Sequence, residues 1–175
     1  MKYKIAHRTG PMNCTLREVE VDIEPLTLLI GDIDGFYDLH ALSEGVFGDD
    51  FIVYGKYTRR YPEDGFHFRS FSKVFDMLTK LVKDTSPLSS LICPTYSPFL
   101  LDEFFDEERR RQTGEVAYKK NCAVLVATIY NGEIVIGNLD LEKFYREFAY
   151  ILTLGEAWMN LSEAVFLGLT TQEKC

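Results

Sequence analysis

The chain has 175 residues, of which 46% are hydrophobic and 26% are charged, and this composition excludes a disordered protein. That length fits one domain over residues 1–175 with its own core, and no apolar run is long enough to cross a membrane. The formal net charge of −8 argues against direct binding of nucleic acid, because phosphate contacts need a concentrated basic surface.

The cysteines and the N-terminal residues predict the cellular compartment. Cys14, Cys93, Cys122 and Cys175 form no CxxC pair and have no regular spacing, which is typical of reduced thiols. The first residues alternate polar and apolar side chains, as a strand does, and lack the apolar stretch of a signal peptide. We therefore expect a cytoplasmic protein.

The first half of the chain predicts several strands and one helix. Residues 2–7 and 17–22 alternate polar and apolar side chains and are predicted as strands. Pro25 introduces an unbroken apolar run over residues 26–30, ended by Gly31, which indicates a strand buried on both faces. The next predicted elements are a short helix over residues 38–47 and an aromatic, β-branched strand over residues 51–57.

The second half begins with an amphipathic helix over residues 70–83, in which lysines separate apolar side chains at helical spacing. Pro94 stops a short buried strand over residues 88–93. Asn131–Gly132 between two alternating runs is the strongest short signal for a β-hairpin. The hairpin strands are residues 121–130 and 133–137, and the remaining predicted helices are residues 99–108, 139–152 and 156–166.

The order of these elements predicts an α/β fold. Strands that alternate with helices in the middle of the chain indicate a parallel core. The N-terminal strands and the late hairpin add antiparallel strands at the edges. We therefore predict a mixed β-sheet with a parallel core and antiparallel edge strands, with helices packed on it.

Four segments of the chain follow one another in the order seen in a known family. They are KYKIAHRTGPMNCTLREVEVDIEPLTLLIG, YPEDGFHFRSFSKVFDMLTKLVKD, SLICPTYSPFLLDEF and LEKFYREFAYILTLGEAWMNLSEAVFLG. Together they resemble the heads of RecF/SMC/OLD-like ABC ATPases: the strands before the phosphate-binding loop, the segment after the Walker B strand, the switch strand and the C-terminal tail. The resemblance implies a truncated P-loop head that lacks the helical lobe with the signature motif.

The phosphate-binding loop implied by this resemblance lacks its essential side chains. A P-loop, GxxxxGK[ST], uses glycines to wrap the phosphates, a lysine to bind them and a Ser or Thr to bind Mg²⁺. Counted from Gly31, the last three positions hold Phe36, Tyr37 and Asp38, and no lysine occurs between Gly31 and Gly55. Further aspartates in the same loop would repel phosphate oxygens.

The other nucleotide-handling positions are replaced as well. Aligning residues 62–65 with the PExG motif of the family puts Arg60 and Tyr61 where the Mg²⁺-linked Asp and the catalytic Glu stand. The switch histidine corresponds to Tyr96. An arginine cannot hold Mg²⁺, and a tyrosine of ordinary pKa cannot polarise water at neutral pH. The resemblance therefore implies a protein without nucleotide hydrolysis and without a cofactor.

Other residue patterns do not indicate a metal or nucleic-acid site. His7, His40 and His67 lie far apart and match no metal-ligand spacing. The basic run at residues 109–111 directly follows an acidic run at residues 106–108, and the two can pair along one helix. We expect no metal and no direct contact with nucleic acid.

These observations lead to one function hypothesis with alternatives. The leading hypothesis is a catalytically inactive ABC-ATPase-like adaptor or regulatory subunit that binds an active ATPase or a nuclease. Family analogy implies a bacterial defence or mobile-element setting. The alternatives are an acidic inhibitor or decoy of a related ATPase, a self-assembling structural subunit that forms a homo-oligomer, and a fold reused as an enzyme or small-ligand receptor.

Overall fold

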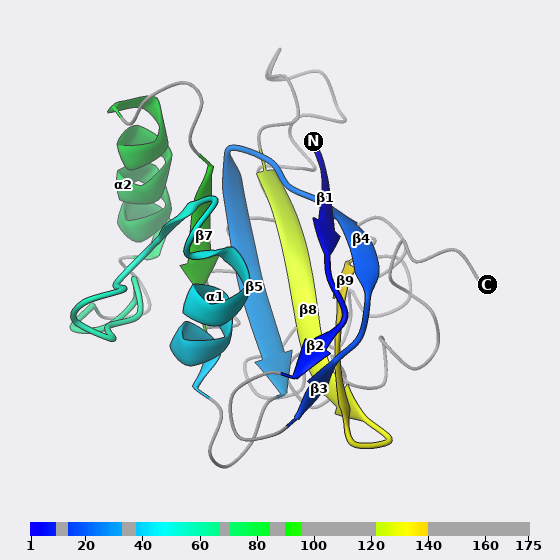
Figure 1. Cartoon of the computed structure of the whole chain (residues 1–175). Helices are drawn as coiled ribbons and strands as arrows, with labels where there is room; N and C mark the ends of the chain where they lie inside the picture. The colour runs from blue at the N-terminus through cyan, green and yellow to red at the C-terminus, as the bar shows by residue number, and fades with distance from the viewer. Residues whose placement is uncertain (10–13, 33–37, 67–70, 85–89, 96–121, 140–175) are drawn as a thin grey trace, which may run out of the picture.

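The computed structural model describes residues 1–9, 14–32, 38–66, 71–84, 90–95 and 122–139 (Figure 1). Within these residues the elements are β1 (Lys2–Ile5), β2 (Arg8–Thr9), β3 (Thr15–Leu16), β4 (Val19–Asp22), β5 (Leu26–Asp32), α1 (Leu39–Phe47), β6 (Ile52–Val53), α2 (Phe71–Asp84), β7 (Leu91–Pro94), β8 (Cys122–Tyr130) and β9 (Glu133–Asn138).

Seven of the strands form one mixed sheet in the order β2-β3-β9-β8-β5-β7-β6. The four strands β8, β5, β7 and β6 run parallel to one another, whereas β9 is antiparallel to β8. This arrangement confirms the predicted α/β class with a parallel core and an antiparallel edge. Two features differ from the prediction. The short β3 lies parallel to β9, with β2 paired to β3. The N-terminal strands β1 and β4, predicted at an edge of this sheet, form a separate two-stranded sheet.

The central strand β5 is buried on both faces, as its unbroken apolar sequence predicts. Leu28 and Ile30 belong to the core on one face of the sheet, while Leu29 belongs to the core on the other. All three side chains are fully buried. Because side chains alternate along a strand, only a continuous apolar run can serve two cores at once.

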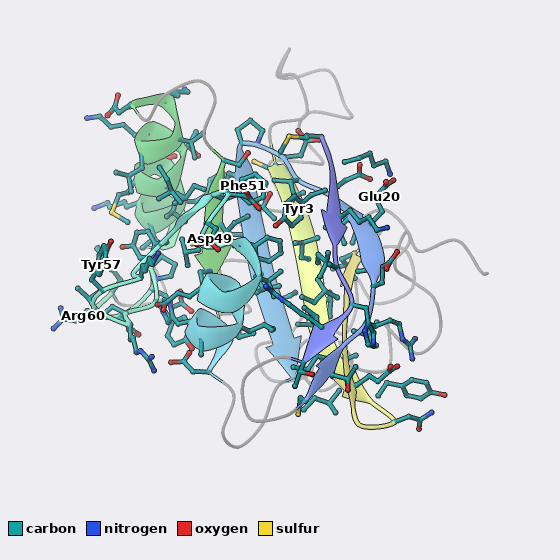
Figure 2. All side chains as sticks on the ribbon, in the orientation of Figure 1. Tyr3, Glu20, Asp49, Phe51, Tyr57 and Arg60 are labelled. Carbon is teal, nitrogen blue, oxygen red and sulfur yellow. The ribbon has the colours of Figure 1, made fainter. Side chains whose placement is uncertain are left out.

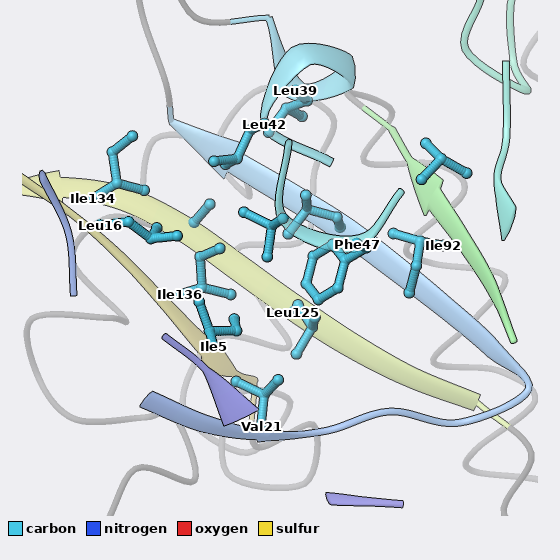
Figure 3. Packing of buried hydrophobic residues seen from close by; sticks show 14 of the residues in the cluster. Ile5, Leu16, Val21, Leu39, Leu42, Phe47, Ile92, Leu125, Ile134 and Ile136 are labelled. Carbon is cyan, nitrogen blue, oxygen red and sulfur yellow. The ribbon is translucent and has the colours of Figure 1, made fainter. Parts of the chain in front are cut away.

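The two helices cover opposite faces of this sheet. On one face, Val74 and Leu78 of α2 pack on the core that contains Leu28. On the other, apolar residues of α1 pack on the core that contains Leu125 (Figure 3). Phe47 of α1 is the largest fully buried side chain among the described residues. Truncating it to alanine would cost about 3–5 kcal/mol, so this face anchors α1 firmly.

The hairpin between β8 and β9 turns at Asn131–Gly132, as predicted. Both residues have positive φ, 49° and 78° respectively, which is the geometry that tight hairpin turns require. The strands then pair from Tyr130 opposite Glu133 to Leu125 opposite Asn138.

A separate two-stranded ribbon, β1 with β4, is fastened to the large sheet through a side-chain amide. The Asn138 amide nitrogen donates to the carbonyl of Asp22 over 2.9 Å, and the amide of Asp22 donates to the Asn138 side-chain oxygen over 2.6 Å. Asn138 is buried, and these bonds occupy both of its polar atoms. Ile5 and Val21 of the ribbon pack into the same core as α1.

Several predicted boundaries were wrong. The strand predicted over residues 51–57 is only Ile52–Val53, because Gly55 takes a φ of +69° and starts a turn. The strand predicted to end before Gly31 continues to Asp32. The first two predicted strands are shorter than predicted and correspond to β1 and β4. Leu139 does not begin a helix but pairs with β8, because its amide donates to the carbonyl of Val124 over 2.9 Å. The helices predicted over residues 99–108 and 156–166, and the rest of the helix predicted over residues 139–152, lie outside the described residues.

No helix in the described part of the chain is long and apolar enough to pass through a membrane.

Candidate functional site

Two parallel strands bring the segments of the implied nucleotide site to one edge of the sheet. β5 and β7 are neighbours, with Leu29 opposite Pro94, and the amide of Thr95 donates to the carbonyl of Leu29 over 3.0 Å. The chain that follows β5 leads into α1, so the first residues of α1 lie at this edge too. In α/β folds the carboxyl edge of parallel strands is the usual location of a binding site.

Asp38 caps the N-terminus of α1. Its extended backbone, with φ of −81° and ψ of 136°, and its side-chain oxygen, which accepts from the amide of His40 over 2.9 Å, are those of an N-cap residue. The same oxygen accepts from the hydroxyl of Tyr61 over 2.6 Å. A helix N-terminus otherwise offers its free amides to a bound anion. Here a carboxylate of the chain itself occupies that position.

These contacts set the charge of Asp38. Burial alone would raise its pKa, but the hydrogen bonds from Tyr61 and from the His40 amide, together with the charges of His40 and Arg59, lower the pKa below its ordinary value. Asp38 is therefore a fixed negative charge at neutral pH. A polyphosphate brought to this helix end would meet that charge in place of the hydroxyl of a P-loop Ser or Thr.

Tyr61 is held in place by the tight turn that follows it. Its amide donates to the Asp64 carboxylate over 2.8 Å, and the amide of Asp64 donates to the Tyr61 carbonyl over 3.1 Å. The ring of Tyr61 packs on the ring of His40, with centroids 4.6 Å apart. Local turn chemistry and one ring contact thus aim the Tyr61 hydroxyl at Asp38.

Glu63 ties the same turn to β7. The hydroxyl of Thr95 donates to the Glu63 carboxylate over 2.7 Å, and Thr95 is fully buried. The neighbouring thiol of Cys93 has a pKa well above its ordinary value, first because it is completely buried and second because the Glu63 charge is near. A thiol in that state is protonated and unreactive, so Cys93 is not a nucleophile.

His40 is a polar group that the sequence did not single out for this site. It is fully buried, and neither ring nitrogen has a hydrogen-bond partner. Unpaired buried nitrogens cost stability, on the order of 1–3 kcal/mol. Because the ring has no exposed surface, it packs within this edge and does not contact solvent directly.

Strand packing, and not phosphate binding, explains why residue 31 is a glycine. Gly31 lies inside β5 opposite Ala127 of β8, and a side chain at this position would collide with the Ala127 carbonyl oxygen. A glycine is thus required for two strands to approach closely. The first glycine of the implied P-loop is therefore a structural residue of the sheet.

The remaining residues predicted for the nucleotide site divide into three that the structure describes and three that it does not. The structure brings Asp38 and Tyr61 into contact, but it places Arg60 on the surface, in the turn after β6, and not at a strand end. Phe36, Tyr37 and Tyr96 lie outside the described residues. No local pattern indicates the hydrogen bond between Glu63 and Thr95, since the two residues are 32 positions apart.

The polar groups at this edge bond mainly within the chain, except for the ring nitrogens of His40, which have no partner among the described residues. Within the described ranges, no group of three or more His, Cys, Asp or Glu side chains is placed to hold a metal ion. Two carboxylates at this edge accept hydrogen bonds from side-chain hydroxyls: Asp38 from Tyr61, and Glu63 from Thr95. No family model matches the chain, and comparisons with curated proteins and with solved structures found no significant similarity.

Proposed function

We propose that this chain is a catalytically inactive, ABC-ATPase-like adaptor or regulatory subunit that binds a protein partner. The observation that carries the proposal is the 2.6 Å hydrogen bond from Tyr61 to Asp38. The resemblance aligns both residues with nucleotide-handling positions, and here they bond to each other. Residues that in an ATPase would bind Mg²⁺ and activate water hold the fold together instead.

The arrangement of the strands supports the same proposal. The strand that leads to the implied phosphate loop, β5, lies directly beside the strand that leads to the implied switch, β7. An ATPase head needs these two strands to be neighbours, because its phosphate loop and its switch residue act on the same nucleotide. The adjacency is thus retained while the side chains for chemistry are replaced, which is expected where a scaffold serves binding.

The partner we propose is an active ATPase or a nuclease subunit in the cytoplasm of a bacterium, in a defence or mobile-element system. The setting comes from the family resemblance alone. Cys14, Cys93 and Cys122 are free thiols in the structure, which suits a reducing compartment. An acidic inhibitor of a related ATPase and a self-assembling subunit are the competing functions.

Affinity purification of the tagged chain from its host, followed by mass spectrometry, tests the adaptor function. We expect an ATPase or nuclease to be recovered in stoichiometric amount. The ATP hydrolysis of that partner, measured with and without the chain, separates the competing functions: an adaptor leaves it intact or raises it, whereas an inhibitor depresses it. Recovery of the chain alone contradicts the partner hypothesis and favours a homo-oligomer.

Calorimetric titration with MgATP tests the inactive site separately. We expect no binding by the wild-type chain, and none by Asp38→Ser, because the substitution restores a hydroxyl but supplies no lysine for the phosphates. Saturable binding of MgATP by the wild-type chain would contradict the loss of nucleotide function, whatever the purification recovers.

A further inference from the structure

A compact turn extends from the edge of the sheet immediately after β6, the last strand in the sheet order. Gly55 begins the turn, and its carbonyl accepts from the amides of Thr58 and Arg59 over 3.1 and 2.7 Å. A side chain at Gly55 would collide with the Arg60 carbonyl and with the buried ring of His40. The turn is therefore packed directly against the site edge and has a defined shape.

This turn borders a surface groove with an apolar floor. The groove has a volume of about 540 Å³, and its lining includes Phe51, Ile52, Tyr54, Lys56, Tyr57 and Arg60. The side chain of Tyr57 is 92% exposed and that of Ile52 is 41% exposed. Figure 2 shows Tyr57 and Arg60 projecting from the turn, away from the sheet. A tyrosine this exposed stabilises nothing within the chain, whereas exposed aromatic and arginine side chains are typical of interfaces.

The turn is also basic, in a protein of net charge −8. Lys56, Arg59 and Arg60 lie within five residues, and none takes part in the ion pairs found within the described ranges of the chain. Two of the nearby acidic residues accept hydrogen bonds: Asp50 from the hydroxyl of Tyr3 and Asp64 from the amide of Tyr61, each over 2.8 Å. Lys56 and Arg60 line the groove, whereas the exposed Arg59 lies near Asp38, where its charge helps to lower the pKa of that carboxyl.

One of these cations occupies a strained backbone position. Arg59 has a φ of +50°, which an L-residue other than glycine or asparagine rarely adopts. Such outliers concentrate at functional sites, where the side chain matters more than the ease of the turn.

We propose that this groove, which we call the β6 groove, is the docking surface for an acidic segment of the protein partner. Apolar side chains of that segment lie on Phe51, Ile52 and Tyr57. Its carboxylates pair with Lys56 and Arg60, which line the groove, and with the adjacent, exposed Arg59. Charge complementarity selects this occupant, because a basic groove attracts an acidic segment, whereas the net charge of −8 on each copy opposes the pairing of two copies of the chain. The inference rests on the proposed adaptor function and names the part of the chain that would perform it.

Fluorescence anisotropy tests the groove without the natural partner. The probe is a fluorescein-labelled peptide of alternating glutamate and phenylalanine, and the comparison peptide has lysine in place of glutamate. We expect the acidic peptide to bind the wild-type chain and the triple variant Lys56→Glu, Arg59→Glu, Arg60→Glu to weaken binding roughly ten-fold or more. Failure of the acidic peptide to bind, or equal binding by the triple variant, overturns the proposal.

The matched control carries the same change of charge on α2, as Lys73→Glu, Lys80→Glu, Lys83→Glu, where all three lysines are exposed. We expect it to bind the acidic peptide within a few-fold of the wild type, and a loss equal to that of the groove variant overturns the proposal. Tyr57→Ala provides a second test that leaves the net charge unchanged. Its ring is almost fully exposed, so folding should be unaffected while peptide binding weakens several-fold.

Two further measurements separate the other occupants and the two proposals. Tighter binding of a single-stranded thymidine oligonucleotide than of the acidic peptide, or a dimer in sedimentation that the triple variant dissolves, overturns an acidic protein segment as occupant. In the affinity purification, loss of the partner with the groove variant but not with the α2 control supports the groove. A partner retained by both overturns the groove alone, whereas peptide binding without any recovered partner overturns the adaptor function alone.

Discussion

The hydroxyl of Tyr61 donates to the carboxylate of Asp38 over 2.6 Å, and this bond joins the turn after β6 to the N-cap of α1. The ring of His40, on the first turn of α1, packs against the ring of Tyr61. Two elements that approach the same edge of the sheet from different parts of the chain are thus fixed to each other. A nucleotide-binding protein would leave this helix end open to phosphate.

Tyr61→Phe removes this hydrogen bond and keeps the ring contact with His40. We expect it to lower the free energy of unfolding by about 1–2 kcal/mol, because the lost bond has a charged acceptor but lies only partly buried. Urea unfolding measures the change. Tyr57→Phe is the control, since its ring is 92% exposed, and it should leave stability within about 0.5 kcal/mol of the wild type. Equal losses in the two variants would show that the bond contributes nothing specific.

The parts of the fold that local signals encode could be predicted from the sequence. The run from Leu26 to Ile30 has no polar break except Thr27, whose hydroxyl bonds locally to the Glu24 carbonyl, so the strand is recognisable on its own. Asn131–Gly132 specifies its turn in the same local way. The strand predicted over residues 51–57 failed because its aromatic and β-branched residues favour a strand, while Gly55 and Arg59 turn the backbone.

The candidate site depends on contacts between distant residues, which the sequence does not encode locally. Asp38 is recognisable as the start of a helix, but its bond to Tyr61 spans 23 positions. The alignment with a Walker B strand placed Arg60 and Tyr61 at a strand end, whereas the strand ends at Val53. Only Ile52 and Val53 pair with β7, and Gly55 then turns the backbone away from a strand.

Asp38→Asn tests the charge of the helix cap. The pKa of Asp38 is below its ordinary value of 3.8 in the folded chain, since hydrogen bonds from Tyr61 and the His40 amide, with the charges of His40 and Arg59, together outweigh the effect of burial. The ionised carboxylate therefore contributes stability above that ordinary value, and the contribution is lost as pH falls through the lower, folded-state pKa. Asparagine also caps helices but does not titrate. We expect the variant to show a shallower loss of stability in acid, measured by urea unfolding across the acid range.

Tyr61→Phe serves as the counterpart in that pH series. It keeps the Asp38 carboxylate but removes a donor that favours the ionised form, so the pKa of Asp38 should rise. The acid loss of stability due to Asp38 should then be smaller than in the wild type and complete at a higher pH. If Asp38→Asn and Tyr61→Phe both follow the wild-type acid profile, Asp38 does not control acid stability.

Tyr3→Phe tests the contact between β1 and the loop after α1. Burial, and then the hydrogen bond to Asp50, raise the pKa of Tyr3 from 10.0 to about 12. The stabilising contribution of the protonated hydroxyl is therefore complete below pH 10.0 and is lost as pH rises through about 12. We expect Tyr3→Phe to cost about 1 kcal/mol at neutral pH and to show a smaller loss of stability in this alkaline range.

The control for Tyr3 is Asp50→Asn, which keeps an oxygen acceptor but removes the charge that helps to raise the Tyr3 pKa. Its alkaline loss of stability should be smaller than in the wild type and complete at a lower pH. Spectrophotometric titration of tyrosinate absorbance, compared among the three proteins, reports the same shift directly. An unchanged titration in Tyr3→Phe would rule out Tyr3 as the high-pKa tyrosine.

Arg59→Gly separates the needs of the fold from those of the β6 groove. Glycine relieves the left-handed backbone, at a cost of about 1–2 kcal/mol to an L-residue, but it loses roughly 0.5–1 kcal/mol in chain entropy. We expect a net gain in the free energy of unfolding of up to about 1 kcal/mol, together with weaker binding of the acidic peptide. Arg60→Gly removes an equal charge at a position without positive φ, so it should weaken binding too but lower stability.

Urea unfolding and anisotropy on both variants measure the two effects. A stability loss in Arg59→Gly as large as in Arg60→Gly would mean that the backbone at Arg59 is not strained, whereas unchanged peptide binding in both would remove the two arginines from the groove.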